Sequence, residues 1–99
     1  MITSVPEAEE ISEALRDGLV KLLPPADLAQ VALDEIDSST PLLSLPIDSV
    51  VLMALMNDIE DRFKVYIPEE EAFSFTVVGE IADYVRGRLG DKARRRENS

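Results

Sequence analysis

Few residues of this chain are of types that do chemistry. Its 99 residues include no histidine and no cysteine, so the usual general base, the commonest metal ligand and a thiolate nucleophile are all missing. Carboxylate pairs at helical spacing, Glu9/Glu13 and Glu80/Asp83, belong to solvated faces. The run Glu69–Glu71 lacks the alternating ligands and the turn glycine of a calcium loop. We therefore expect no catalytic residue and no metal site, which argues against a self-contained hydrolase or transferase.

The pair Asp48-Ser49 remains, directly before an apolar helical stretch. Asp is a preferred N-cap residue, and simple capping accounts for a lone Asp-Ser pair. A serine on the first turn of a helix is also exposed, and a chain without His or Cys can present such a nucleophile without activating it. A second pair, Asp37-Ser38, precedes Ser-Thr-Pro instead of an apolar helix, and we reject it as the site.

Hydrophobic periodicity predicts the elements that position this pair. We expect a first helix from a cap at Ser4 to the proline pair at 24–25, a second over 50–63, a single turn over 69–73, and a last helix from a cap at Thr76 to Gly90. Spacings of three and four place these residues toward the core: Ile11, Leu15, Leu19, Leu22 and Leu23; Leu52, Leu55, Met56, Ile59 and Phe63; Val78, Ile81, Ala82, Val85 and Leu89. Gly18 lies inside the first pattern, at a cost of about 1 kcal/mol against Ala.

The segment over residues 24–48 has the composition of a long loop. It contains a stretch suited to a short helix, Ala26–Leu33, and turn-forming residues at Asp37–Pro41. Connections this long are uncommon unless they are functional or anchored, and we expect Leu42 or Leu43 to be the anchor. The sequence thus predicts an all-α bundle of three main helices plus one short helix, with a long loop between the first two.

Charge is unevenly distributed along the chain. The net charge is −10, but residues 1–85 hold 18 acids and 4 bases (−14), whereas residues 86–99 hold 2 acids and 6 bases (+4). We expect a domain over residues 1–90 and a basic, flexible tail over 91–99. An acidic domain repels nucleic acid. With no run of about 20 apolar residues and no signal peptide, we expect no membrane association and a cytoplasmic protein. We also expect the free protein to be a monomer.

Further anchors follow Asp48-Ser49 at fixed intervals. They are Glu60-Asp61-Arg62-Phe63, Ile67-Pro68, Glu69-Glu70-Glu71, Thr76-Val77 and Asp83-Tyr84-Val85. With these anchors the sequence resembles an acyl carrier protein. That family has Asp-Ser-Leu at the head of its second helix, then an acidic pair with Phe, an Ile-Pro, a short acidic third helix and Thr-Val before the fourth. The intervals match without a gap from Asp48 through Val85.

The resemblance implies that Ser49 receives 4′-phosphopantetheine from coenzyme A. A separate phosphopantetheinyl transferase would supply the metal and base, and Asp48 would cap the helix and orient its first turn. The loaded form would carry a substrate as a thioester on the arm's thiol. The chain would then be a carrier that partner enzymes modify and use, not an enzyme.

This chain also departs from the family pattern. Val50 replaces the usual Leu, Pro46-Ile47 replaces a small or Gly-containing pair, and Val51 and Ala54 stand where acids are common. We predict a largely apolar partner interface comprising Val50, Val51, Ala54, Asp58, Glu60 and Asp61. In the competing interpretation Val51 packs against the long loop, and the substitution Val51→Asp would test the interface.

The altered second helix favours a discrete carrier of polyketide or nonribosomal-peptide biosynthesis. Its partners would be acyltransferase, adenylation or ketosynthase-type enzymes, and its complexes transient. The alternatives are a carrier of fatty-acid synthesis and, from another class, an acidic helical module that binds a protein partner without a prosthetic group. Acceptance of Ser49 by a phosphopantetheinyl transferase discriminates between carrier and module.

Overall fold

The computed structural model describes residues 5–97, with side chains described as far as residue 91. Its three long helices are α1 (Ala8–Leu22), α3 (Ser49–Phe63) and α5 (Val78–Glu97). The shorter elements are α2 (Pro25–Leu28), the 3-10 turns η1 (Leu33–Glu35) and η2 (Leu42–Ser44), and α4 (Glu69–Ala72). No strand occurs among the described residues. The predicted all-α bundle with a long connection between its first two main helices is confirmed.

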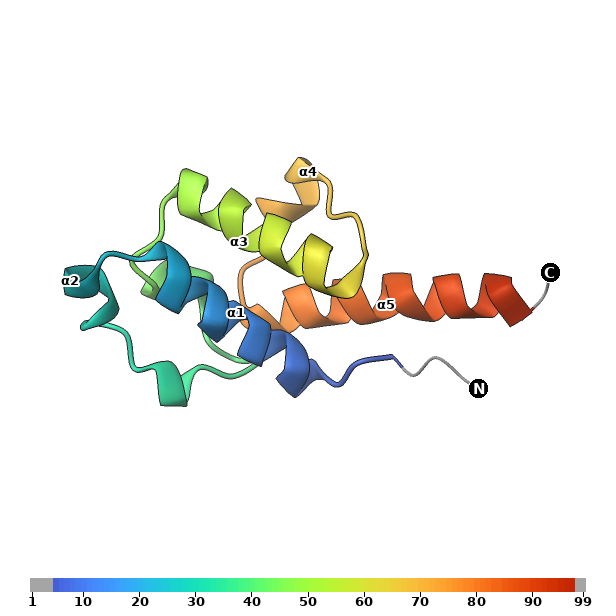
Figure 1. Ribbon diagram of the computed structural model, residues 1–99, viewed down its shortest axis with the longest axis horizontal. Coiled ribbons are helices and arrows are strands. Elements are labelled where there is room, and N and C mark those ends of the chain that lie inside the picture. The colour runs from blue at the N-terminus through green and yellow to red at the C-terminus, as the bar shows by residue number, and fades with distance from the viewer. Residues whose placement is uncertain (1–4, 98–99) are drawn as a thin grey trace.

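The helices pack around α1, which contacts both α3 and α5, while α4 lies against α3. Figure 1 shows the C-terminal half of α5 extending past the other helices, which gives the molecule its elongated extents of 49 × 26 × 21 Å. The last helix was predicted to end near Gly90, and this prediction is wrong because α5 continues to Glu97. No helix among the described residues is long and apolar enough to span a bilayer.

The core is built from the periodic residues of the three long helices. Its buried members include Ile11, Leu15 and Leu19 of α1, Leu55, Met56 and Ile59 of α3, and Val78, Ile81, Ala82 and Val85 of α5. Leu22, Leu52, Phe63 and Leu89 are partly buried against this cluster. The long loop contributes Ile36, Leu42 and Leu45. Periodicity therefore predicted which face of each long helix is buried. It also placed these four partly buried residues in the interior, whereas they lie at the edge of the core.

The long loop has less helix than predicted. Instead of one helix over Ala26–Leu33, it has the single turn α2 and, separately, η1. The anchor is Leu42, which is 5% exposed, whereas Leu43 is 98% exposed. Leu42 N also donates a hydrogen bond to Thr76 O at 2.9 Å, which ties the loop to the start of α5.

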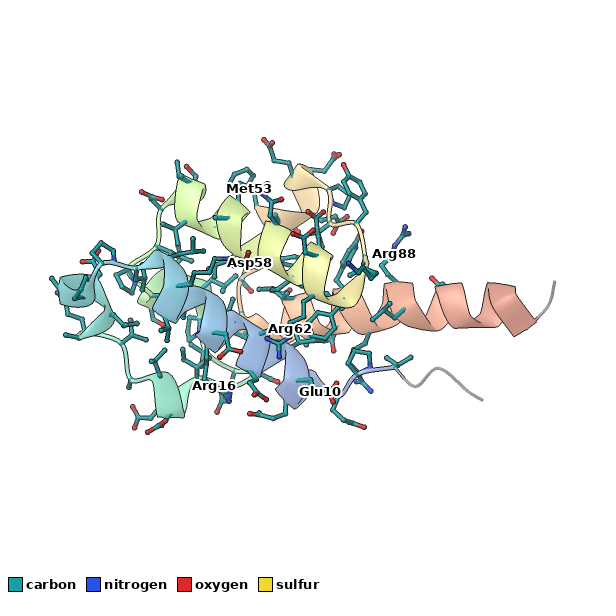
Figure 2. The ribbon with its side chains drawn as sticks, viewed as in Figure 1. Glu10, Arg16, Met53, Asp58, Arg62 and Arg88 are labelled. Carbon is teal, nitrogen blue, oxygen red and sulfur yellow. The ribbon has the colours of Figure 1, made fainter. Side chains whose placement is uncertain are left out.

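Gly18 lies at a close contact between α1 and α3. A Cβ at this position would lie 2.6 Å from Leu55 Cδ2, so the glycine that weakens α1 locally lets the Leu55 side chain pack against this helix without shifting. Ion pairs flank this contact, with Lys21 Nζ 3.0 Å from Asp58 Oδ1 and Arg62 Nη1 3.0 Å from Asp17 Oδ2. Figure 2 shows Asp58 and Arg62 along α3. Exposed pairs of this kind contribute at most about 1 kcal/mol each.

The helix starts differ from the predicted caps. The N-cap of α1 is Glu7, whose side chain makes no capping hydrogen bond, and the predicted cap Ser4 lies outside the described residues. Thr76 was predicted to cap the last helix, but here the carboxylate of Glu80 is the acceptor. It accepts hydrogen bonds from the Thr76 backbone N–H, the Thr76 hydroxyl and the Val77 N–H.

These hydrogen bonds affect the titration of Glu80. Led by the Thr76 hydroxyl, they lower the pKa of the Glu80 carboxyl below its ordinary value. Since the folded pKa is depressed, the associated stabilisation is present above the unfolded pKa and is lost as pH falls through the folded one. The start of α5 is therefore held more firmly above the unfolded pKa of this carboxyl than in acid.

Gly79 allows the long loop to pack on the first turn of α5. Gly79 N donates a hydrogen bond to Ser38 O at 2.8 Å, and a Cβ on Gly79 would lie 2.8 Å from the same carbonyl oxygen. We expect Gly79→Ala to lower the free energy of unfolding by about 1–3 kcal/mol because backbone atoms must move. Gly87→Ala is the matched control on the same helix.

A Cβ on Gly87 meets no atom within 4 Å, so this variant should gain up to about 1 kcal/mol from helix propensity. Urea unfolding of both variants measures the difference. Equal stabilities for the two would show that the Ser38 contact is not tight.

Candidate functional site

Asp48 and Ser49 form the start of α3. Asp48 is the N-cap residue, with extended backbone, and its Oδ1 accepts a hydrogen bond from Val51 N at 2.8 Å. Its carbonyl oxygen accepts from Leu52 N at 2.9 Å, which closes the first helical turn. Ser49 is the first residue of the helix and is exposed. The cap therefore fixes the turn from which the Ser49 hydroxyl is presented to solvent.

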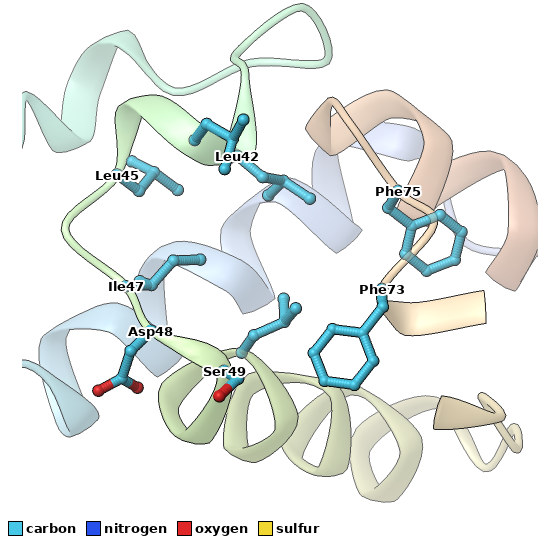
Figure 3. A pocket seen from close by; sticks show the side chains of 9 residues that line it. Leu42, Leu45, Ile47, Asp48, Ser49, Phe73 and Phe75 are labelled. Atoms are coloured by element: carbon cyan, nitrogen blue, oxygen red, sulfur yellow. The ribbon is translucent and has the colours of Figure 1, made fainter. Parts of the chain in front are cut away.

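One side of this turn borders a hollow of about 270 Å³, which we call the loop-side hollow. Its lining residues are Leu42, Leu43, Leu45, Ile47, Asp48, Ser49, Leu52, Phe73 and Phe75. Figure 3 shows the labelled apolar side chains converging from the long loop and from the segment after α4. Asp48 and Ser49 supply the polar groups, so an apolar space opens directly beside the serine.

A second hollow of about 420 Å³ lies between α3 and α4, and we call it the α4-side hollow. It is lined by Ser49, Val50, Met53, Ala54, Asn57, Glu69 and Phe73. It is the more polar of the two because Asn57 and Glu69 contribute to it. Ser49 and Phe73 are the two residues that line both hollows.

The residues predicted to form a partner interface face several different neighbours. Val50 is 75% exposed, while Val51 is partly buried against the core. Ala54 lines the α4-side hollow. Asp58 pairs with Lys21 of α1 at 3.0 Å. Val51, Ala54 and Asp58 therefore have different neighbours: the core, the α4-side hollow and α1.

The two remaining acids of the predicted interface also differ. The Glu60 carboxylate accepts a hydrogen bond from Ile67 N at 2.7 Å and so holds the segment after α3. Asp61 is exposed, near the ion pair between Asp17 and Arg62. Of the six residues, Val50 and Ala54 lie in the α4-side hollow next to Ser49.

The second Asp-Ser pair has a different structure. Asp37 Oδ1 accepts hydrogen bonds from Ser39 N at 2.9 Å and Ser39 Oγ at 2.7 Å, an Asx turn. The Ser39 hydroxyl, followed by the Ser39 N–H, lowers the pKa of the Asp37 carboxyl below its ordinary value. No helix begins directly after Ser38, whose carbonyl oxygen accepts a hydrogen bond from Gly79 N. This pair is a loop anchor.

Two features of the site were not predicted from sequence. Phe73 and Phe75, on either side of Ser74, form one wall of the loop-side hollow. The available signal in the sequence was a pair of phenylalanines two positions apart at the end of a short helix. Leu43 was considered only as an anchor, yet it is exposed and lines the hollow. Within the part of the chain that the structure describes, no three His, Cys, Asp or Glu side chains are grouped to hold a metal ion.

The residues fit a group attached at Ser49. The hydroxyl is exposed, the Asp48 carboxylate is directed to Val51 N, and apolar space adjoins the serine. Residues 18–85 match a family model described as the phosphopantetheine attachment site, the domain in which acyl carrier proteins hold 4′-phosphopantetheine covalently.

Two acyl carrier proteins are similar to the chain. The one from Beutenbergia cavernae is 37% identical over 43 residues, which are 43% of this chain and about half (52%) of that protein. The one from Lactobacillus acidophilus is 30% identical over 83 residues, which are 83% of this chain and 96% of that protein. The family model spans more than half of the chain and includes Asp48-Ser49. The chain belongs to the acyl carrier protein family.

Proposed function

We propose that Ser49 bears 4′-phosphopantetheine and that the chain presents cargo to partner enzymes while catalysing no step itself. The observation that carries this proposal is the exposed Ser49 hydroxyl on the capped first turn of α3, with hollows on two sides. When bound, the group supplies a thiol on a long flexible arm, which holds an acyl or aminoacyl cargo as a thioester.

The chain's own groups support presentation of the serine and not its activation. Asp48 lies beside Ser49, but its Oδ1 accepts the Val51 N–H, and the sequence has no histidine to take the serine proton. The proton must therefore pass to a base of the phosphopantetheinyl transferase. Partnership with such a transferase and with biosynthetic enzymes follows from membership of the family.

The start of α3 also suits an anion on Ser49. Its first turn carries no acidic residue, whereas the first turn of α4 holds Glu69, Glu70 and Glu71. The positive end of the helix dipole favours a phosphate there. Among the described residues that line the two hollows, the acids are the N-cap Asp48 and, on the α4 side, Glu69.

For the pathway, we propose polyketide or nonribosomal-peptide biosynthesis, with acyltransferase, adenylation or ketosynthase-type partners. The support is that Val51 and Ala54 of α3 stand at positions where carriers of fatty-acid synthesis often have acids, and that Ala54 lines the α4-side hollow beside Ser49. Incubation of the loaded protein with enzymes of each class tests this proposal. Loading by fatty-acid synthesis enzymes alone would favour the alternative.

Intact mass tests the carrier function directly. The full chain is incubated with coenzyme A, magnesium and a broad-specificity phosphopantetheinyl transferase that is active on a control carrier. We expect the mass to increase by one phosphopantetheine. If the folded chain gains no mass, Asp48-Ser49 is a structural cap, and the interaction module becomes the better interpretation.

Val50→Asp tests whether partners dock through apolar contact. Val50 is 75% exposed, so a charge there should leave stability nearly unchanged. Val51→Asp is less informative because Val51 is partly buried against the core. We expect Val50→Asp to reduce kcat/KM for loading of cargo by a partner enzyme by about tenfold. This is the effect of losing about 1.4 kcal/mol of contact energy.

The matched control for Val50→Asp is Val20→Asp, which makes the same change at a 53% exposed position of α1. The control should load at the rate of the unmodified sequence. Equal rates for the two variants would remove Val50 from the docking surface.

A further inference from the structure

Exposed apolar side chains are concentrated around Ser49. Within the described part of the chain, the exposed large hydrophobic residues are Val20, Leu43, Val50, Tyr66 and Phe73. Three of these five, Leu43, Val50 and Phe73, line the hollows that adjoin Ser49. Apolar exposure gathered at one site marks a place where an apolar group binds.

Phe73 has the central position among these side chains. It borders both hollows, and besides Ser49 no other described residue does so. Its side chain is 50% exposed, and Figure 3 shows its ring projecting from the end of α4 toward α3, on the side of the hollow where Ser49 lies. The ring therefore stands between the loop-side and α4-side hollows.

The backbone of Phe73 is fixed although α4 is short. Phe73 N donates a hydrogen bond to Glu69 O at 3.1 Å, and Ala72 N donates to Pro68 O at 3.0 Å. Ala72 is fully buried, which holds this turn against the core. The aromatic ring is thus presented from a rigid support, as a side chain that positions a ligand requires.

The chemistry of the prosthetic group indicates which part meets this ring. Beyond the phosphate, the first apolar part of 4′-phosphopantetheine is its carbon with two methyl groups. The loop-side hollow is the better match because Leu42, Leu52 and Phe75 line it, while Asn57 and Glu69 make the other side polar. A cavity of about 150 Å³ already holds benzene, so about 270 Å³ is ample for a dimethyl group.

We propose that Phe73 is a positioning residue for the prosthetic arm: its ring packs against the dimethyl-bearing end of the arm in the loop-side hollow. This inference rests on the proposed attachment at Ser49. The ring restricts the directions in which the arm leaves the serine, and the α4-side hollow stays open beside Val50 for contact with partner enzymes.

Nuclear magnetic resonance of the loaded full chain tests the inference without any activity measurement. The arm is installed from coenzyme A that carries ¹³C in its two methyl groups, and mass spectrometry first confirms the modification. We expect nuclear Overhauser contacts between these methyl protons and the Phe73 ring protons. We also expect the methyl resonances to be shifted from their positions in free coenzyme A by the ring current.

Three variants make the result decisive. In Phe73→Ala the ring contacts are lost and the methyl resonances should move most of the way to their free positions. Phe73→Leu should keep a contact with the side chain but lose the ring-current shift. Tyr66→Ala, which removes an exposed aromatic ring outside both hollows, should leave the methyl resonances where they are.

The outcomes separate the two proposals. If the unmodified sequence and all of its variants fail to gain the arm, the attachment proposal fails. If the arm is attached but its methyl protons show free-arm shifts and no contact to Phe73, the positioning proposal alone is overturned. Spectra of the variants before loading establish that they fold, and Phe73→Leu provides the comparison if Phe73→Ala does not.

Discussion

Ser49→Ala is expected to abolish the mass gain of one phosphopantetheine completely, because the Ser49 hydroxyl oxygen is the atom to which we propose that the group attaches. Ser49 is exposed, and exposed substitutions of this kind change the free energy of unfolding by no more than about 0.5 kcal/mol. Since Asp48 still caps Val51 N in the variant, α3 should begin at the same residue. Loss of modification would then reflect the missing nucleophile and not a damaged fold.

The control for this variant is Ser38→Ala, which alters the other Asp-Ser pair. Ser38 lies in an Asx turn and contributes its backbone carbonyl to Gly79 N, so removing its hydroxyl should leave both the fold and the mass gain unchanged. Peptide mass spectrometry of the loaded chain locates the modified residue. A mass gain retained in Ser49→Ala, or a modified peptide that contains Ser38, would move the site away from α3.

Local sequence patterns predicted the capped helix start at Asp48-Ser49 better than they predicted its surroundings. Asp48 and Ser49 adjoin in the chain, and capping, exposure and the dipole all follow from the first turn of one helix. The hollows depend instead on the packing of α4 and the long loop against α3. Phe73 could not be placed from sequence because a four-residue helix has no periodicity to indicate its buried side.

Glycines show the same limit in another form. Gly18 was judged by helix propensity alone, and its use became evident only from the 2.6 Å approach of Leu55 to a Cβ at that position. Gly90 was expected to end the last helix, but α5 continues through it to Glu97. A glycine in a helical pattern can end the helix or allow a neighbouring element to pack closely against it. Tertiary contacts decide between the two.

Leu42 and Leu43 are identical residues that the sequence could not tell apart, and they should respond very differently to the same substitution. Leu42 is 5% exposed and belongs to the core cluster, whereas Leu43 is 98% exposed. We expect Leu42→Ala to lower the free energy of unfolding by about 2–5 kcal/mol through lost burial and an unfilled cavity. Leu43→Ala should change it by no more than about 0.5 kcal/mol.

The larger loss has a consequence at the site because Leu42 also lines the loop-side hollow. Domains of this size have a total stability of about 5–15 kcal/mol, so Leu42→Ala removes a substantial part of it and loosens the loop that Leu42 N ties to Thr76 O. Urea unfolding followed by circular dichroism measures both variants, and modification of the folded fraction is compared at matched concentrations. Similar stabilities for Leu42→Ala and Leu43→Ala would contradict the anchor assignment. A selective loss in Leu42→Ala would show that one buried leucine holds the long loop against the helices that present Ser49.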